Sequence, residues 1–130
     1  MSRHSVNRVV LTGRLTQDPQ LRALPSGLRV CSMRIACTSP KRVEQGDYQE
    51  KPHFFNVNVY GDQAEDVDIY TRKGRSVAIE GRLVWREWKD PDRGRREAVT
   101  VAADAVQFLD DPGESIDDFG AKYSIHHQSA

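Results

Sequence analysis

The sequence contains few of the residues that bind metals or build a catalytic site. Among its 130 residues are two cysteines and four histidines, and the histidines are His4, His53, His126 and His127. None of these shares a motif with a cysteine, a serine nucleophile or a carboxylate at ligand spacing. The glycines are isolated, so there is no glycine-rich phosphate loop. We therefore expect no metal, no cofactor, no catalytic residue and no enzymatic activity.

Long apolar segments are also missing. No apolar run approaches the roughly 20 residues that a membrane-spanning helix needs. The first residues, Met1 to Asn7, lack the apolar region of a secretory signal. The sequence therefore predicts a soluble intracellular protein with no membrane partner.

The two cysteines are expected to stay reduced. Cys31 and Cys37 lie six residues apart in an expected strand, which separates them by about 20 Å. That distance is too long for an intrachain disulfide. They share their strand face with Met33 and Ile35, so we expect them to act as buried, small apolar residues. A bridge to a symmetry mate in an oligomer is left open.

A formal net charge of zero hides an asymmetry along the chain. Residues 1–109 hold 18 Lys and Arg against 14 Asp and Glu, whereas residues 110–130 hold one Lys and five acids. The second segment also has no hydrophobic period. The sequence therefore predicts one folded domain over 1–109 and a short disordered acidic tail over 110–130. A mildly basic body is compatible with a polyanionic ligand.

Alternating apolar residues predict five strands, over 8–15, 28–38, 54–60, 76–88 and 97–108. Turn residues bracket a short connector over 18–27, and a polar loop is expected over 39–52. Asp62 can begin a helix that runs to about Arg72 and stops at Gly74. Gly81 is expected to kink the fourth strand. Five strands with one helix between the third and the fourth predict an all-β OB-fold barrel.

Aromatic residues occupy the expected solvent face of two strands. The third strand has an apolar face and a second face that carries Phe54, Asn56, Asn58 and Tyr60. Trp88 shares a face of the fourth strand with Arg86. Stacking of an unpaired base on an aromatic ring contributes ~1–3 kcal/mol in proteins that bind single strands. Because duplex bases hide their faces, this pattern favours single-stranded nucleic acid.

Other roles for these aromatics stay open. An aromatic on a solvated strand face can simply cover a neighbouring loop, and Trp88 can lie at an oligomer contact. Trp85 has the opposite parity, so the core or a subunit interface is its expected place. Basic residues flank the aromatics and would bind phosphates without reading sequence. They are Arg34, Lys41, Arg42, Arg72, Lys73, Arg86, Lys89, Arg95 and Arg96.

An ordered series of short motifs covers roughly residues 6–109. It consists of Asn7-x-Val9-x-Leu11-x-Gly13-x-Leu15-x-x-Asp18-Pro19, Ser26-Gly27, Tyr60-Gly61-x-x-Ala64-Glu65 and Lys73-Gly74-x-x-Val77-x-Ile79-Glu80-Gly81-Arg82-Leu83. Together the motifs resemble the bacterial single-stranded DNA-binding protein family. The resemblance implies an OB-fold, a homotetramer, and cooperative wrapping of single-stranded DNA during replication, recombination and repair. It also implies a cytoplasmic, nucleoid-associated protein.

The resemblance assigns roles residue by residue. It implies base stacking by Phe54, where the family commonly has Trp, by Tyr60, where Phe is common, and by Trp88. It implies basic contacts from Arg3, Arg72, Lys73, Arg86 and Arg96.

Two departures from the family pattern stand out. Many members have a further stacking Trp at the start of the long loop, where this chain has Pro40. Typical members end in an acidic peptide that closes on Ile-Pro-Phe and recruits other proteins, whereas this chain closes on Ser124 to Ala130. Recruitment of the usual partners through that tip is therefore not expected, and the chain is hypothesised to be a specialised second copy.

Two alternatives are kept beside single-stranded DNA binding. One is a primosome-type OB protein whose main role is to assemble partner proteins. The other is an OB module that binds an oligosaccharide or a protein. Basic residues beside the aromatics argue against a sugar site, which favours carboxylates and amides.

Overall fold

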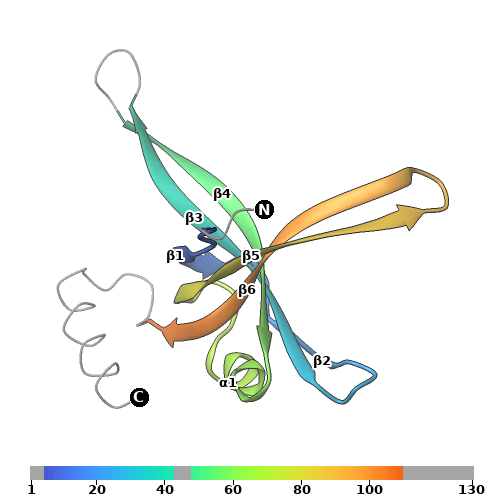
Figure 1. Cartoon of the computed structure of the whole chain (residues 1–130). Coiled ribbons are helices and arrows are strands. Elements are labelled where there is room, and N and C mark those ends of the chain that lie inside the picture. Colours follow the sequence, from blue (N-terminus) through green and yellow to red (C-terminus); the bar gives the residue numbers. More distant parts are fainter. Residues whose placement is uncertain (1–4, 43–47, 110–130) are drawn as a thin grey trace.

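The computed structural model describes residues 5–42 and 48–109, and the side chains of all of these except 39–42 and 48–50. Within this part, six strands and one helix follow each other along the chain (Figure 1). They are β1 (Val9–Leu15), β2 (Gln20–Ala23), β3 (Arg29–Arg42), β4 (Tyr48–Tyr60), α1 (Asp62–Tyr70), β5 (Ser76–Asp90) and β6 (Gly94–Phe108). The predicted acidic tail over 110–130 lies outside the described residues.

The strands form a closed ring. Their order in the sheet is β1-β5-β6-β4-β3-β2, and an additional pairing of β1 with β3 closes five of them into a barrel. The pairing of β4 with β6 is parallel and the others are antiparallel. The helix α1, the only one in the described residues, connects β4 to β5 and covers one end of the barrel (Figure 1). This arrangement confirms the predicted OB-fold barrel with one helix between its third and fourth long strands.

Two glycines let the strands of the barrel approach closely. The register of β5 against β6 shifts between Glu80 and Gly81, which confirms the kink predicted there. A Cβ on Gly81 would lie 2.1 Å from the carbonyl oxygen of Ala102. A Cβ on Gly13 would lie 2.6 Å from the carbonyl oxygen of Ala36, where β1 leaves β5 to pair with β3. Only glycine leaves room for these backbone contacts.

The strands extend further than the hydrophobic pattern predicted. The expected connector over 18–27 contains the short strand β2, whose four residues pair with β3 although all are exposed. Most of the expected loop over 39–52 continues the β3–β4 ladder, and residues 43–47 are not described. Backbone hydrogen bonds hold such extensions together without an apolar face, so alternation does not reveal them. Two long hairpins, β3–β4 and β5–β6, therefore project from the barrel (Figure 1).

The core lies inside the barrel and is built from the predicted apolar faces. Val57 and Val59 of β4 are fully buried, as are Cys31 and Ile35 of β3. From α1, Ala64 and Val67 are buried, and at its end the inward residue is Thr71, while Tyr70 is exposed. Val99 was expected on the same apolar face as Val101. It is 56% exposed because the β5–β6 hairpin has left the barrel at that point.

Both cysteines are free thiols, and Cys31 is buried as predicted, whereas Cys37, which was also expected to be buried, is only half-buried. Burial raises the pKa of the Cys31 thiol to about 11 and also raises the pKa of Cys37. Within the described ranges, no helix has the length and apolar character that a membrane crossing requires.

Candidate nucleic-acid interface

The solvent face of β4 presents the aromatics that the alternation predicted. Phe54 is 49% exposed and Tyr60 is 41% exposed, and both share their face with Asn56 and Asn58. The opposite face, with Val57 at its centre, packs into the core. The strand therefore fixes two rings and two amides on the outside of the barrel because its inner face is buried.

Trp88 lies on the β5–β6 hairpin, on the same strand face as Val84 and Arg86. Its side chain is 40% exposed. The guanidinium of Arg86 lies over the indole, 4.7 Å from the ring centroid. Arg96 pairs with Trp88 across the hairpin, so the two side chains share one face. This brings two predicted phosphate-binding residues next to a predicted base platform.

A second cation–π pair joins β3 to β4. The guanidinium of Arg34 lies 5.0 Å from the ring centroid of Phe54. Arg34 pairs directly with Asn56 in the β3–β4 ladder, so it reaches diagonally across to the neighbouring aromatic. Phe54 and Trp88, two of the three predicted base-stacking residues, thus each have an arginine over the ring.

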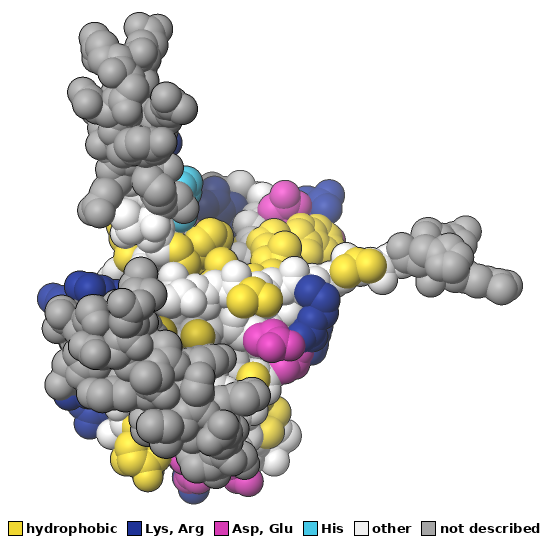
Figure 2. Space-filling view, turned by 90° about the vertical axis from the view of Figure 1, so that its left-hand side faces the viewer, with side chains coloured by type: hydrophobic (Ala, Val, Ile, Leu, Met, Phe, Trp, Pro, Cys, Tyr) yellow, Lys and Arg dark blue, Asp and Glu magenta, His cyan; other side chains and the backbone are white. Residues whose placement is uncertain are grey.

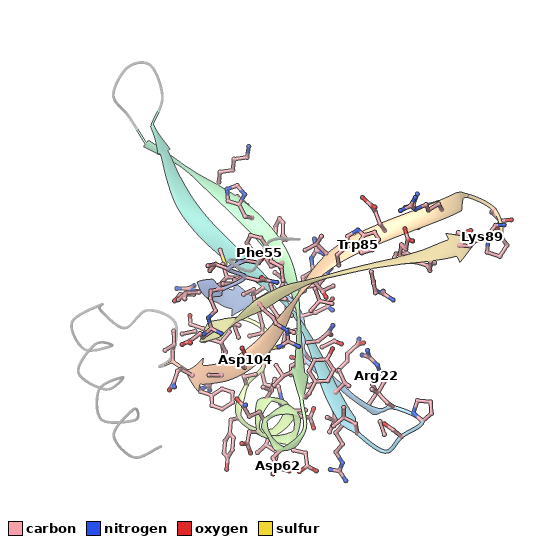
Figure 3. The ribbon with its side chains drawn as sticks, in the orientation of Figure 1. Arg22, Phe55, Asp62, Trp85, Lys89 and Asp104 are labelled. Carbon is pink, nitrogen blue, oxygen red and sulfur yellow. The ribbon has the colours of Figure 1, made fainter. Side chains whose placement is uncertain are left out.

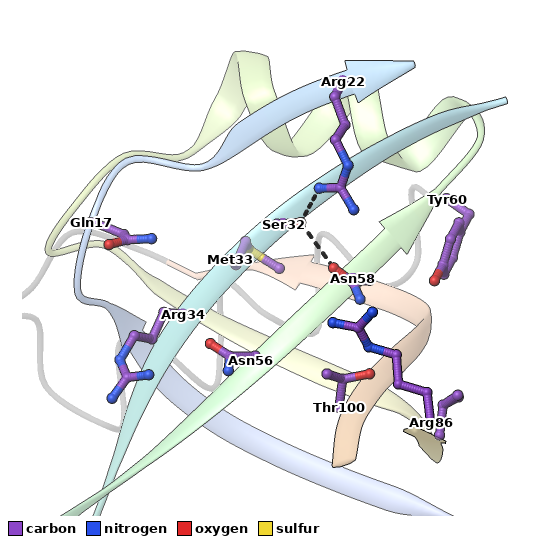
Figure 4. A pocket seen from close by; sticks show the side chains of 11 residues that line it. Gln17, Arg22, Ser32, Met33, Arg34, Asn56, Asn58, Tyr60, Arg86 and Thr100 are labelled. Carbon is purple, nitrogen blue, oxygen red and sulfur yellow. Dashed lines mark hydrogen bonds between the residues drawn. The ribbon is translucent and has the colours of Figure 1, made fainter. Parts of the chain in front are cut away.

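A groove of about 400 Å³ lies between Arg34 and Arg86, the arginines of these two pairs (Figure 4). Its lining comes from four barrel strands and from the segment around β2. The lining residues are Gln17, Arg22, Ser32, Met33, Arg34, Asn56, Asn58, Tyr60, Val84, Arg86 and Thr100. None of these residues is acidic, and three of them are arginines. The tertiary structure therefore brings together Tyr60, Arg34 and Arg86, while Phe54 and Trp88 are not among the lining residues.

Most of the acidic residues that form ion pairs in the described part of the chain lie outside the groove. Arg8 pairs with Glu80 and Asp104, and Arg82 also pairs with Asp104. On the β5–β6 hairpin, Arg95 pairs with Glu87, which has the opposite parity to Arg86. In the described part of the chain, the guanidinium of Arg86 has no ion pair or hydrogen bond. It makes a cation–π contact with the indole of Trp88. The cations of the groove are thus left available for an anionic ligand.

Trp85 occupies the other face of the β5–β6 hairpin. Its side chain is 53% exposed, and its Nε1 donates a hydrogen bond to the Glu97 carboxylate at 3.2 Å. It lies outside the barrel (Figure 3). The expectation of Trp85 in the core is therefore wrong for the single chain, because the hairpin has no partner strand beneath it. The expectation of a subunit interface stays a prediction.

The basic residues after α1 have structural contacts of their own. Arg72 donates hydrogen bonds from Nη1 to the carbonyl oxygens of Asp68 and Thr71, which neutralises the end of the helix. The backbone N–H of Lys73 donates to Asp18 Oδ1 at 2.9 Å, which ties this turn to the segment next to Gln17. Lys73 is thereby placed near the groove through its backbone, and its side chain is exposed.

Some predicted contacts fall outside the described part. Arg3 is not among the described residues, and the side chains of Pro40, Lys41 and Arg42 are not described. Their predicted roles stay predictions.

Sequence reasoning missed Arg22 and Ser32 as groove residues. Arg22 lies in β2, which was read as a connector, and its place beside β3 follows only from strand pairing. Ser32 was placed on the outer face of β3 by its parity but was not considered as a site residue. A polar residue at the right parity was the only available signal.

Comparison with known proteins gives one consistent result. Residues 6–109 match the Single-strand binding protein family. The single-stranded DNA-binding protein of Wolinella succinogenes is 38% identical over 109 residues, which cover 84% of this chain and 67% of that protein. The single-stranded DNA-binding protein of Halalkalibacterium halodurans is 40% identical over 122 residues, which cover 88% and 71%.

Solved structures agree with the sequence relatives. A crystal structure of a deletion mutant of the single-stranded DNA binding protein from Thermus aquaticus matches with a TM-score of 0.74 and 32% identity. The match covers 84% of this chain and 53% of that one, so the chain spans about half of the Thermus aquaticus protein. The Plasmodium falciparum SSB complex with ssDNA matches with a TM-score of 0.74 and 27% identity, over 85% of this chain and 100% of that one.

Proposed function

This chain belongs to the single-strand binding protein family and binds single-stranded DNA, and we propose that it does so without sequence specificity along the groove face. In this proposal, bases stack on Phe54, Tyr60 and Trp88. Phosphates are bound by basic residues of the same surface: Arg3, Arg34, Lys41, Arg42, Arg72, Lys73, Arg86 and Arg96.

The observation that carries the proposal is the pairing of exposed rings with arginines that have no acidic partner on that face. Arg86 lies over Trp88 and Arg34 lies over Phe54, at either side of a groove without a lining carboxylate. Stacking supplies a sequence-tolerant contribution of ~1–3 kcal/mol per base, and the cations supply the salt-dependent phosphate contribution. An oligosaccharide site would place carboxylates as well as amides around the aromatics, whereas the lining of this groove has amides and arginines but no carboxylate.

Tryptophan fluorescence tests the proposal directly, because the chain has only two tryptophans. In a Trp85→Phe variant, Trp88 is the only indole. Titration with oligothymidylate is expected to quench its fluorescence, whereas duplex DNA of the same length is not expected to quench it. A Trp88→Phe variant reports Trp85 as the matched control and is expected to respond much less. Equal quenching by duplex and single strand would contradict the stacking surface. Absence of any response would favour a protein-assembly module.

Residues 1–109 form the DNA-binding domain in this proposal, and the chain assembles as a homotetramer. An exposed apolar patch supports the assembly: Leu83, Trp85 and Val99 are 46%, 53% and 56% exposed on the face opposite the groove. Figure 2 shows that hydrophobic side chains also gather over the middle of the face that lies at the left-hand side of Figure 1. Patches of this kind mark interaction sites. Sedimentation equilibrium with and without reductant measures the assembly, and a monomer under both conditions would contradict it.

The cellular role is proposed at the level of the family. The protein protects and organises single-stranded DNA in replication, recombination and repair, in the cytoplasm and nucleoid, and it is not an enzyme.

A further inference from the structure

Three polar side chains on the wall of the groove are joined by two hydrogen bonds. Nη1 of Arg22 in β2 donates to Oγ of Ser32 in β3 at 2.7 Å, and Oγ of Ser32 donates to Oδ1 of Asn58 in β4 at 2.9 Å. Figure 4 shows both bonds, with Ser32 between the other two side chains. Neither the function proposed above nor the family match assigns a role to these residues.

We propose that this Arg22–Ser32–Asn58 relay holds the Asn58 amide so that its NH2 group donates a hydrogen bond to a carbonyl oxygen of the base stacked on Tyr60. The inference rests on the proposed single-stranded DNA function and assigns it a base contact. Asn58 is then a binding residue, and Ser32 and Arg22 are positioning residues that act through it.

The direction of the relay follows from the donor inventory of the side chains. A guanidinium has donors only, so Ser32 must accept from Arg22. The single hydroxyl proton of Ser32 is then free to be donated onward, and the atom that it meets on β4 is an acceptor. That partner is Oδ1 of Asn58, so Nδ2 of the same amide faces away from Ser32. Figure 4 shows the amide nitrogen of Asn58 on the side of Arg86 and Thr100.

The NH2 group of Asn58 lacks an acceptor in the described part of the chain. Among the described residues, the only hydrogen bond of this amide is the one that Oδ1 accepts from Ser32. Arg86, which also lines the groove, brings further donors without a described hydrogen-bond acceptor. Arg86 is exposed and Asn58 is half-buried, so water can bind these donors until a ligand oxygen replaces it. The groove can therefore receive an oxygen at this point.

The position of Asn58 selects a base carbonyl as that oxygen. Asn58 and Tyr60 are two residues apart on one strand face, so their Cα atoms are separated by about 7 Å. A base lying on the Tyr60 ring presents its edge toward Asn58 at this spacing. Phosphate oxygens are the natural partners of the arginines at the sides of the groove, Arg34 and Arg86, because these carry full charges.

A base analogue separates this contact from stacking. Difluorotoluene has the shape of thymine and stacks, but its fluorine atoms are very weak acceptors. We expect the wild-type protein to bind oligothymidylate roughly three- to tenfold more tightly than the difluorotoluene oligomer. This is the difference in affinity that one to two net hydrogen bonds produce. Asn58→Ala and Ser32→Ala are expected to bring this ratio close to one. Ser32→Thr, which keeps the hydroxyl, is expected to retain it.

The matched control is Asn56→Ala, which removes an amide from the same face of β4 but leaves the relay intact, so it should keep the ratio. A second series replaces one phosphate of oligothymidylate by a neutral methylphosphonate. Its penalty should be the same in wild type and in Ser32→Ala. If Ser32→Ala changes the methylphosphonate penalty and leaves the base ratio intact, the relay serves a phosphate and the inference is wrong.

Loss of the base contact and loss of DNA binding would give different results. Equal affinity of the wild-type protein for the thymine and difluorotoluene oligomers would overturn only the base contact. Failure to bind oligothymidylate at all would overturn the proposed function and the base contact with it. Because the ratio is measured within each variant, a partial loss of folded protein does not alter it.

Discussion

Replacing Trp88 by alanine tests the geometry of the groove face most directly. The indole is 40% exposed, and Arg86 lies over it at 4.7 Å. A stacked base contributes ~1–3 kcal/mol, whereas a cation–π pair at an exposed site contributes about 0.5–1 kcal/mol. The free energy gained by stacking therefore exceeds the free energy of the Arg86 contact, so stacking stays favourable even where the base has to displace the guanidinium. The displaced guanidinium is then free to pair with a phosphate.

The net loss on Trp88→Ala is expected to be about 1–2 kcal/mol, which weakens binding roughly 5- to 30-fold at fixed salt. Arg86→Met should act differently because it removes a charge. Its loss should reduce the magnitude of the slope of log affinity against log salt by about 0.7 for one phosphate contact on a single strand. Trp88→Ala should leave that slope unchanged, since the ring carries no charge.

The assay is fluorescence anisotropy of a labelled oligothymidylate, titrated at several salt concentrations. Trp85→Phe is the matched control, because it alters an exposed tryptophan on the opposite face of the same hairpin. Affinities of Trp88→Ala and Tyr60→Ala that both equal the wild-type value would refute the stacking surface. A salt slope near zero for the wild-type protein would refute the phosphate contacts.

Three further predictions concern the fold that positions this surface. Gly81→Ala places a Cβ 2.1 Å from a backbone oxygen of Ala102, so it should lower the free energy of unfolding in urea by ~1–3 kcal/mol; an unchanged midpoint would contradict the close approach. Asp18→Ala removes the acceptor of the Lys73 N–H and should lower the free energy of unfolding by ~0.5–1.5 kcal/mol, with a smaller loss for Asp18→Asn. Folding raises the pKa of Cys31 from about 9 to about 11, so the folded state holds this proton more tightly and stability should fall as pH rises between these values. Cys31→Val should show a shallower fall over the same pH range, and identical pH profiles of the two proteins would contradict the role of the thiol.

Much of the site was predictable because strand faces alternate locally. The parity of β4 separates Phe54 and Tyr60 from Val57, and this requires only that the segment be extended with one face buried. The same reasoning placed Trp88 with Arg86 beyond the kink at Gly81. The cysteines followed their strand parity as well. Predictions of which residues share a strand face were therefore reliable, but the burial of that face was not always predicted, since Val99 is exposed and Val101 is buried.

Predictions that depended on neighbouring strands were weaker. The exposure of Trp85 and Val99 follows from the length of the β5–β6 hairpin beyond the barrel, which no local pattern records. β2 was missed because its residues are all exposed, and its existence depends on backbone pairing with β3. The alternation of apolar residues indicates which face of a strand is apolar, but it does not indicate where a sheet ends.

The sequence by itself therefore determined the strand faces, the barrel class and the exposed aromatic side chains of β4, because side-chain alternation is a property of the extended chain. The tertiary structure alone decided that Arg22, Ser32 and Asn58 form one hydrogen-bonded relay and that the arginines of the groove face no carboxylate across it. These three residues come from three strands, with a separation of 10 residues between Arg22 and Ser32 and of 26 between Ser32 and Asn58. Their contact is fixed by strand register and barrel closure, which are long-range properties that a local period does not contain.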